Sequence, residues 1–198
     1  MIKFILRAAI KAFYKVEVTG LDNLPKHGPA ILAMNHQSYL DAVALYAFVD
    51  RDINFLAYYK LFDVKFVGSI LRKHKDIAIK EKDAEQIKHA FAQCCDVLDH
   101  DKLLCIFPEG ALSPDGEIHS FKHGIKHLWM NCPKPIIPIA IDGFWHTIFS
   151  RRPLKAKLRT NPFRRKKLKI NIAPSIQFDG QPAYPANLQS IVEKLQKS

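Results

Sequence analysis

A histidine and an aspartate five positions apart, His36 and Asp41, are the side chains of this sequence best suited to moving a proton. Histidine titrates near neutrality, so it can accept a proton and return it later. A carboxylate that hydrogen-bonds one ring nitrogen fixes the tautomer, leaves the other nitrogen as the base and stabilises the imidazolium that forms. The chain contains no Gly-x-Ser-x-Gly nucleophile elbow. The proton that His36 accepts is therefore expected to belong to a substrate hydroxyl, which indicates direct transfer onto an alcohol.

The same segment also has a purely structural interpretation. Ser38, followed three residues later by Asp41, fits a capping box, in which Asp41 only starts a helix. His36 would then be a hydrogen-bonded histidine in a loop. These two residues alone leave both interpretations open, so a second motif has to decide between them.

The second group of chemically suited residues is Phe107-Pro108-Glu109-Gly110, which ends an apolar run. Gly110 allows close backbone approach and exposes a peptide N–H, and Glu109 can hydrogen-bond polyol hydroxyls or a basic partner. Downstream, Phe121-Lys122-His123-Gly124 puts a cation and a glycine at the start of a predicted helix, where a phosphate is favoured. Taken alone, Pro-Glu-Gly is typical of a tight turn.

Two strands have to position these motifs. Residues 30–34 and 103–107 are apolar runs of strand length, and each ends where its motif begins. If the two strands are parallel, both motifs lie at the same edge of the sheet, which is where α/β folds place their chemistry. Residues 42–49 and 121–130 are the helices expected to follow.

Strands and helices alternate along the rest of the chain. Further strands are expected at 16–19, 53–58, 77–79, 135–141 and 167–172, and further helices at 1–14, 60–72, 83–98 and 187–196. This alternation predicts an α/β fold, a single domain with a largely parallel central sheet flanked by helices and with an N-terminal amphipathic helix. We expect that helix to occupy residues 1–14 and the domain to occupy residues 15–198.

The N-terminal helix carries four cations at every fourth residue, Lys3, Arg7, Lys11 and Lys15, among apolar side chains. A helix of this length is about 21 Å long, too short to cross a hydrocarbon core of about 30 Å. It is suited to lying in the membrane interface, where each cation near an anionic leaflet contributes about 1 kcal/mol. The alternative is an ordinary helix packed on the domain. No apolar run in the chain reaches the ~18 residues of a membrane span.

The formal net charge of +11 calls for an acidic partner: nucleic acid, anionic lipid or a phosphorylated substrate. The cations concentrate in one segment without acidic residues, at Arg151, Arg152, Lys155, Lys157, Arg159, Arg164, Arg165, Lys166, Lys167 and Lys169. The segment has one aromatic residue, Phe163, and matches no nucleic-acid-binding module. Anionic lipid or an acidic carrier protein explains it at least as well, and a solvated loop is the third alternative. We expect no nucleic-acid partner.

Cysteine and histidine spacing gives no reason to expect a metal. The cysteines are Cys94, Cys95, Cys105 and Cys132, which show no zinc spacing and are expected to be reduced thiols in or near the core of a cytosolic protein. His119, His123 and His127 recur at fours, but no nearby carboxylate completes a site.

Together the motifs resemble the glycerolipid acyltransferases, which include the bacterial 1-acylglycerol-3-phosphate acyltransferases and the acyltransferase domain of lysophosphatidylethanolamine-acylating enzymes. The matching motifs, in order, are Asn35-His36-x4-Asp41, Phe107-Pro108-Glu109-Gly110, Phe121-Lys122-x-Gly124 and Ile137-Pro138-Ile139. They cover about residues 15–145. The histidine motif alone is weakly specific, but in order with Phe-Pro-Glu-Gly it is strongly specific.

The resemblance implies an O-acyltransferase that moves a fatty acyl group from acyl-CoA or acyl-carrier protein to the hydroxyl of a lysophospholipid such as 1-acylglycerol 3-phosphate. It makes His36 the general base and Asp41 its orienting carboxylate. It implies no metal and no cofactor beyond the thioester co-substrate. It also implies a peripheral protein on the cytoplasmic face of the inner or plasma membrane. The expected substrate-binding residues are Asn35, Phe107, Pro108, Glu109, Gly110, Ser113, Lys80 and Lys122.

The sequence departs from the family pattern at two places. Many members continue Phe-Pro-Glu-Gly with Thr-Arg-Ser, whereas Ala111-Leu112-Ser113 follows here. Members also commonly carry an arginine after the strand that corresponds to 77–79, where this chain offers Lys80 or Lys82. A lysine is a point charge and not a bidentate fork. The alternatives are therefore another acceptor, such as lysophosphatidylethanolamine or an ornithine lipid, or a non-catalytic basic module that binds lipid or nucleic acid.

Overall fold

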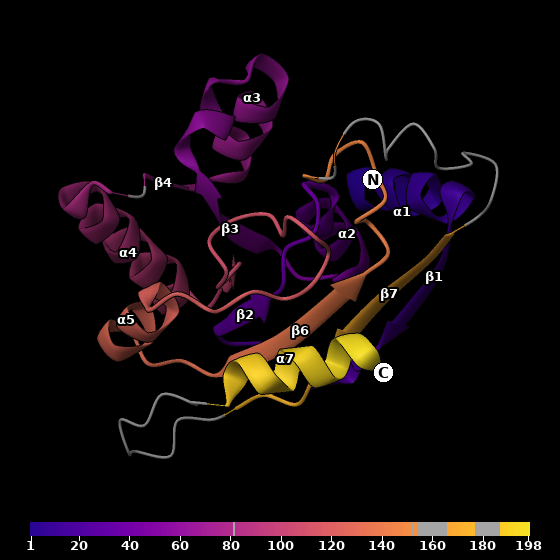
Figure 1. The fold of residues 1–198 in the computed structure, drawn as a ribbon. Coiled ribbons are helices and arrows are strands. Elements are labelled where there is room, and N and C mark those ends of the chain that lie inside the picture. Colours follow the sequence, from indigo (N-terminus) through magenta and orange to yellow (C-terminus); the bar gives the residue numbers. More distant parts are fainter. Residues whose placement is uncertain (81, 152, 154–165, 177–186) are drawn as a thin grey trace.

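The structure, a computed structural model, describes residues 1–80, 82–151, 153, 166–176 and 187–198. Its centre is a seven-stranded sheet in the order β1-β7-β6-β2-β5-β3-β4 (Figure 1). The strands are β1 (Tyr14–Thr19), β2 (Ala30–Met34), β3 (Ile53–Tyr58), β4 (Ile77–Ile79), β5 (Leu103–Ile106), β6 (Ile136–Asp142) and β7 (Lys166–Ile172). Neighbouring strands are parallel except for β6 and β7, which are antiparallel. The predicted α/β fold with a largely parallel sheet is confirmed.

Helices cover both faces of the sheet. One face packs against α1 (Ile2–Phe13) and α2 (Leu40–Phe48), and the other against α4 (Ala84–Asp99), α5 (Gly124–Asn131) and α7 (Leu188–Lys197). Two short helical segments complete the fold: η1 (Leu21–Asn23) follows β1, and η2 (Tyr59–Asp63) follows β3.

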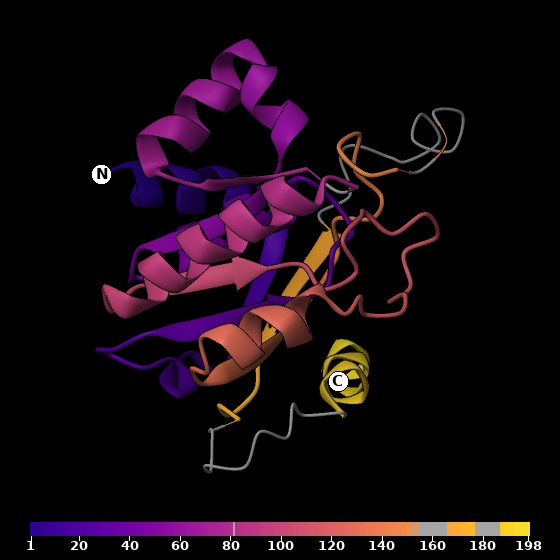
Figure 2. The ribbon, with the colours of Figure 1, turned by 90° about the vertical axis from the view of Figure 1, so that its left-hand side faces the viewer.

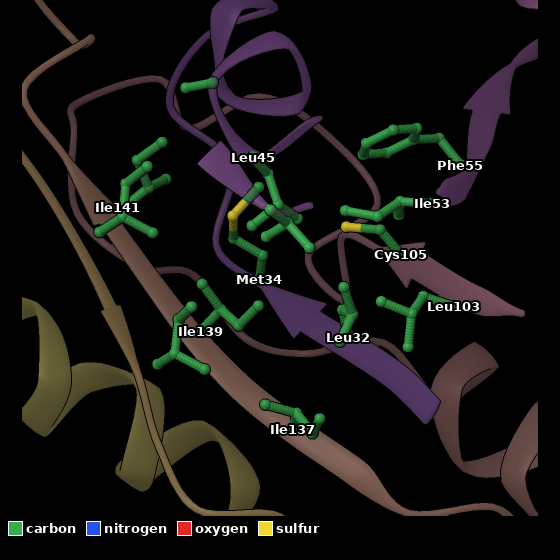
Figure 3. Packing of buried hydrophobic residues seen from close by; sticks show 14 of the residues in the cluster. Leu32, Met34, Leu45, Ile53, Phe55, Leu103, Cys105, Ile137, Ile139 and Ile141 are labelled. Carbon is green, nitrogen blue, oxygen red and sulfur yellow. The ribbon is translucent and has the colours of Figure 1, made fainter. Parts of the chain in front are cut away.

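Strand β2 is buried on both faces because helices pack on each side of it. Leu32 and Met34 point toward Leu45 of α2, as Figure 3 shows, while Ile31 and Ala33 belong to the cluster under α4 and α5. A strand buried in this way reads as a continuous apolar run rather than an alternating one. His36 and Asp41, which follow β2, are therefore positioned by a strand that is packed on both sides.

Residues 60–72 do not form the single helix that was predicted. After η2 the chain passes through an extended Val64 (φ −75°, ψ 115°) and then forms α3 (Lys65–His74). A Cβ atom at Gly68 would lie 1.9 Å from the carbonyl oxygen of Phe62, so a glycine is required for α3 to fold back onto η2. The break arises from this close packing. The hydrophobic pattern of the sequence predicts a helix but cannot predict such a contact.

The cationic side of α1 faces the protein. Lys3 Nζ donates to the carbonyl oxygens of Val49 and Arg51, each at 2.9 Å, and Arg7 donates to the carbonyl oxygen of Ala47. These carbonyls lie at the carboxyl end of α2, where cations also complement the helix dipole. The helix is thus packed on the domain, and its exposed side chains include the apolar Ile2, Phe4, Ile5 and Phe13 together with Lys11.

The prediction that all four cysteines are reduced is wrong for Cys95 and Cys132. Helices α4 and α5 lie side by side and bring the Cα atoms of these residues to 5.6 Å, where they form a disulfide. Cys94 and Cys105 are free and buried, and burial raises the pKa of Cys94 to about 12. The paired cysteines are 37 residues apart, so their pairing depends on the packing of the two helices.

The end of α3 is tied to β3 through an ion pair that should make stability depend on pH. Asp76 Oδ1 accepts hydrogen bonds from the Phe55 N–H (2.8 Å) and from His74 Nδ1 (2.9 Å). The hydrogen bond with Asp76, opposed by burial, raises the pKa of His74 above its ordinary value of 6.5. The stabilisation is fully present below pH 6.5 and is lost as pH rises through the raised pKa.

We therefore expect the free energy of unfolding of the native protein to decrease from about pH 6 to about pH 8 relative to a His74→Gln variant. The neutral amide keeps a hydrogen bond to Asp76 but does not titrate. Urea unfolding of both proteins across this pH range measures the difference. Two parallel profiles would show that the pair does not contribute.

The predicted basic segment lies partly outside the described residues. Of the cations in the basic segment, Arg152, Lys155, Lys157, Arg159, Arg164 and Arg165 are not described. Among those that are, Lys167 pairs with Glu17 at 2.7 Å and Lys169 Nζ donates to the Ser198 carbonyl oxygen at 2.8 Å. Within the described ranges, the helices are all too short or too polar to cross a bilayer.

Candidate active site

The two sequence motifs meet at one edge of the sheet. Strands β2 and β5 are adjacent and parallel, with Ala33 paired to Ile106, so both strands end at the same edge of the sheet. The backbone N–H of Ser113 donates to the carbonyl oxygen of His36 at 2.8 Å, which joins the loops that follow the two strands. The predicted juxtaposition is therefore present.

His36 and Asp41 form a hydrogen-bonded pair. His36 Nδ1 lies 3.0 Å from Asp41 Oδ2. The same oxygen accepts the backbone N–H groups of Gln37 (2.6 Å) and Ser38 (2.7 Å). The carboxylate thus holds the imidazole and the first turn before α2 together. Of the predicted capping box, only the contact of Asp41 with the Ser38 N–H is present; the N-cap of α2 is Tyr39 and not Ser38, and it has no side-chain cap.

Burial shapes the electrostatics of this pair. Asp41 is 0% exposed, and burial raises the pKa of its carboxyl group, although the hydrogen bonds from His36, Ser38 and Gln37 oppose the shift. Because the Asp41 carboxylate accepts from Nδ1, it fixes the tautomer and the orientation of the ring. His36 Nε2 has no hydrogen-bond partner among the described residues, and the side chain remains 14% exposed. The arrangement presents Nε2 as the base.

Phe107 and Glu109 hold the backbone and ring of His36 in place. The Phe107 ring stacks on the imidazole, with centroids 3.8 Å apart and planes 21° apart. Glu109 is 5% exposed, and its two carboxylate oxygens accept the backbone N–H groups of His36 (2.8 Å) and His119 (3.0 Å). Burial raises the pKa of the Glu109 carboxyl group against these hydrogen bonds. Its contacts in the structure are with the backbone, so it acts as a positioning residue for His36.

We expect Glu109→Gln to destabilise the protein by about 1–3 kcal/mol. The two backbone partners of Glu109 are both donors, and an amide offers one acceptor oxygen and one NH2 group. One partly buried N–H therefore loses its acceptor. Urea unfolding measures the loss, and Glu117→Gln, an exposed change in the same loop, is the control. Equal stability of both variants would contradict the bracing role.

Asn35 and Ser113 also make internal contacts. Asn35 Nδ2 donates to the carbonyl oxygen of Ile141 (3.0 Å), and Asn35 Oδ1 accepts the Ile141 N–H (2.7 Å), which joins the end of β2 to β6. Ser113 Oγ accepts the Gly116 N–H (2.8 Å) and donates to the Glu117 carbonyl oxygen (2.8 Å). Both side chains are buried. They shape the site from within, and direct contact with substrate stays a prediction for them.

Pro108, Gly110 and Lys122 lie close together at the Phe107 to Gly110 turn. The Lys122 N–H donates to the Pro108 carbonyl oxygen at 2.8 Å. Gly110 has a positive φ of 66°, and a Cβ atom there would lie 2.6 Å from Lys122 Nζ. A glycine is required both for the backbone conformation and for the close approach of the ammonium group. The cation predicted to bind phosphate is therefore placed next to the Phe-Pro-Glu-Gly turn.

Lys80 is not brought to this cluster. It follows β4, and β3 and β5 lie between β4 and β2 in the sheet. Its Nζ pairs with Asp83 at 3.2 Å on the exposed surface. No group of three or more His, Cys, Asp and Glu side chains within the described residues is placed to hold a metal ion.

Sequence reasoning missed Gln37 and Tyr39. The Tyr39 ring lies edge-on to the imidazole, with centroids 6.5 Å apart. Gln37 lines a pocket of about 620 Å³ together with Gly116, Asp142 and Trp145, and its buried Oε1 has no partner among the described residues. Both residues lie between His36 and Asp41. Their place inside this motif could have marked them as candidates, although their residue types alone gave no reason to single them out.

Comparisons with known proteins agree with this geometry. Residues 15–142 match the sequence profile of the family described as Acyltransferase. The chain is 29% identical over 136 residues to the chloroplastic 1-acyl-sn-glycerol-3-phosphate acyltransferase LPAT1 of Arabidopsis thaliana, a match that covers 68% of this chain and 38% of the relative. It is 30% identical over 158 residues to the 1-acyl-sn-glycerol-3-phosphate acyltransferase of Helicobacter pylori, which covers 78% of this chain and 66% of the relative.

A solved structure shares the fold. The 1-acyl-sn-glycerophosphate acyltransferase PlsC from Thermotoga maritima superposes with a TM-score of 0.73 at 23% sequence identity, over 99% of this chain and 76% of that protein. The chain spans only about two fifths of the length of the plant and algal relatives that it matches, at 38%, 39% and 41%.

Proposed function

The chain belongs to the acyltransferase family, and we propose that it moves a fatty acyl group from a thioester to the hydroxyl of 1-acylglycerol 3-phosphate with His36 as general base. Relatives from a plant and a bacterium are named for this acceptor. The observation that carries the proposal is the pairing of His36 with the buried Asp41 at the sheet edge that also holds the Phe107 to Gly110 turn.

The contacts of His36 support direct transfer of the acyl group onto the acceptor hydroxyl, with His36 as the base. Asp41 accepts the Nδ1–H of His36, which leaves Nε2 to take the proton of the acceptor hydroxyl. The hydroxyl oxygen attacks the thioester carbonyl carbon, the C–S bond breaks, and the imidazolium returns the proton to the departing thiolate. The products are an ester and a free thiol. A positioned base typically contributes 10²–10⁴-fold, and holding both substrates together supplies much of the remainder.

Lys122 and the adjacent turn are the proposed site for the acceptor phosphate. The ammonium group lies beside Gly110, within the loop that Pro108 and the Lys122 N–H close. Leu112 stands where many of the resembling enzymes carry an arginine, and it is 8% exposed. A buried leucine offers no charge to a phosphate. This observation favours a second candidate, the acylation of a lipid acceptor with less phosphate charge: lysophosphatidylethanolamine, whose phosphodiester carries one negative charge, or an ornithine lipid, which has no phosphate.

One assay tests these proposals together. The purified protein is incubated with acyl-CoA or acyl-carrier protein and with each lyso-acceptor in turn, and free thiol and acylated product are measured. We expect thiol release that depends on 1-acylglycerol 3-phosphate and matches the product formed. Release that depends on a different lyso-acceptor would support the second candidate. Absence of release with every donor and acceptor would instead favour a non-catalytic lipid-binding module.

We further propose that the protein works as a peripheral protein on an anionic membrane surface, at the cytoplasmic face. The outward side of α1 carries Ile2, Phe4, Ile5 and Phe13, and an apolar helix side of this kind suits the membrane interface. Because Lys3 and Arg7 bind the end of α2, the attraction of α1 to lipid would come mainly from these apolar side chains.

A further inference from the structure

Helix α3 is held to the protein through the side that carries Gly68. Gly68 packs on the backbone of Phe62, and Arg72 Nη1 donates to the Phe62 carbonyl oxygen at 2.6 Å. At the end of the helix, Asn54 Nδ2 donates to the carbonyl oxygen of His74 at 3.1 Å. These contacts fix which way the helix is turned.

The opposite side of α3 is apolar and exposed. Successive helical residues are about 100° apart, so Phe66 and Ile70 both lie about 160° from Gly68 around the helix axis. Phe66 is 80% exposed and Ile70 is 64% exposed, and Val67, next to Ile70 around the axis, is exposed as well. The described part of the chain leaves this strip uncovered, so it is available to a partner.

The segment that carries the strip has a net positive charge, which defines the charge of that partner. The charged residues of the segment from η2 to the residue after α3 are Lys60, Asp63, Lys65, Arg72, Lys73 and Lys75. The excess of positive charge calls for an anionic surface. An exposed apolar strip on a segment with a net positive charge is the pattern of a helix that lies in the interface of an anionic bilayer.

The position of α3 relative to the candidate active site is consistent with an anionic bilayer as its partner. Strand β3 runs parallel to β5, so it ends at the sheet edge that carries His36, and η2 and the first turn of α3 follow directly. Figures 1 and 2 show α3 projecting beyond the sheet at the end opposite α7. A bilayer in contact with α3 would therefore lie near the edge where the acceptor hydroxyl has to arrive.

We propose that α3 is a membrane-docking helix that inserts Phe66 and Ile70 into the interface of an anionic bilayer. The inference extends the proposed function, since a lipid acceptor would enter the site from the same bilayer. The backbone packing of Gly68 on Phe62 holds the helix so that its apolar strip faces outward. Lys73, about 140° from Gly68 around the same axis, lies beside the strip and contacts the lipid phosphates.

The test is sedimentation of the full chain with vesicles of phosphatidylglycerol and phosphatidylcholine. The double variant Phe66→Glu/Ile70→Glu is expected to bind at least about tenfold more weakly than the native protein, because each substitution removes an apolar side chain from the interface and adds a repelled charge. Met130→Glu is the matched control: Met130 is 58% exposed on α5. It is expected to bind like the native protein. Circular dichroism verifies that all variants are folded.

Vesicle binding is measured without turnover, so its outcome is separate from that of the acyltransferase assay. Native-like binding of the double variant, or an equal loss in Met130→Glu, would overturn the proposal. If the double variant keeps vesicle binding and loses only the turnover supported by acyl-carrier protein, the strip docks an acidic protein and the bilayer assignment is wrong. Stronger binding to phosphatidylglycerol than to phosphatidylcholine alone is expected for the native protein, and the reverse order would also contradict it.

Discussion

His36→Ala is expected to lower acyl transfer by at least about 10²–10⁴-fold, the range that a positioned base contributes. The side chain is the group at the sheet edge whose Nδ1 is held by a buried carboxylate while Nε2 lacks a partner among the described residues. Alanine removes the base and leaves the two backbone N–H groups that Asp41 accepts. Turnover is measured as thiol released in the presence of the lyso-acceptor that the native protein uses.

The control for this variant is His100→Ala. His100 caps the end of α4 and is exposed, so its removal is expected to leave turnover unchanged. Vesicle binding and far-ultraviolet circular dichroism of His36→Ala should also match those of the native protein. Turnover of His36→Ala within a few-fold of the native value would exclude this imidazole as the base.

Asp41→Asn is expected to have the second largest effect, a loss of turnover of about 10²-fold or more together with a loss of stability. An amide oxygen can take the place of Oδ2, but it carries no charge to stabilise an imidazolium. The NH2 group then occupies the position of Oδ1, which is buried and has no hydrogen-bond partner among the described residues. An unsatisfied buried donor of this kind costs about 1–3 kcal/mol.

Temperature separates the two effects of Asp41→Asn. The melting temperature measures the loss of stability, and turnover is then compared well below it, where the variant is folded. A catalytic role predicts that turnover stays low there. Recovery of native turnover at low temperature would leave Asp41 only its contacts with the Gln37 and Ser38 N–H groups at the start of α2.

The sequence alone was sufficient for elements that depend on local pattern. The strands at residues 30–34, 53–58 and 77–79 were predicted with the bounds that the structure has, because an apolar run bounded by polar or turn residues is a local signal. A helix was expected from residue 83, and Asp83 is the N-cap of α4, where its side chain accepts the Gln86 N–H. The meeting of the two motifs followed from the parallel arrangement of their strands.

Boundaries and orientations were less predictable because they depend on neighbours. The helix expected over residues 60–72 is broken by the approach of Gly68 to Phe62. The sequence left open whether the cations of α1 face lipid or the domain, and in the structure Lys3 and Arg7 bind the carbonyl groups at the end of α2. Hydrophobic periodicity indicates that a helix is amphipathic, but it does not say which side the rest of the protein will cover.

From sequence alone came the fold class, the order of the motifs and the candidate base with its carboxylate, because these depend on residue type and short spacing. Only the tertiary structure decided that Glu109 braces the backbone of His36 across 73 positions, that Cys95 pairs with Cys132, and that α3 turns its apolar strip outward. The physical reason is that a hydrogen bond, a disulfide or a covered surface requires two groups within a few ångströms. Such distances between residues far apart in the chain are set by the packing of whole strands and helices.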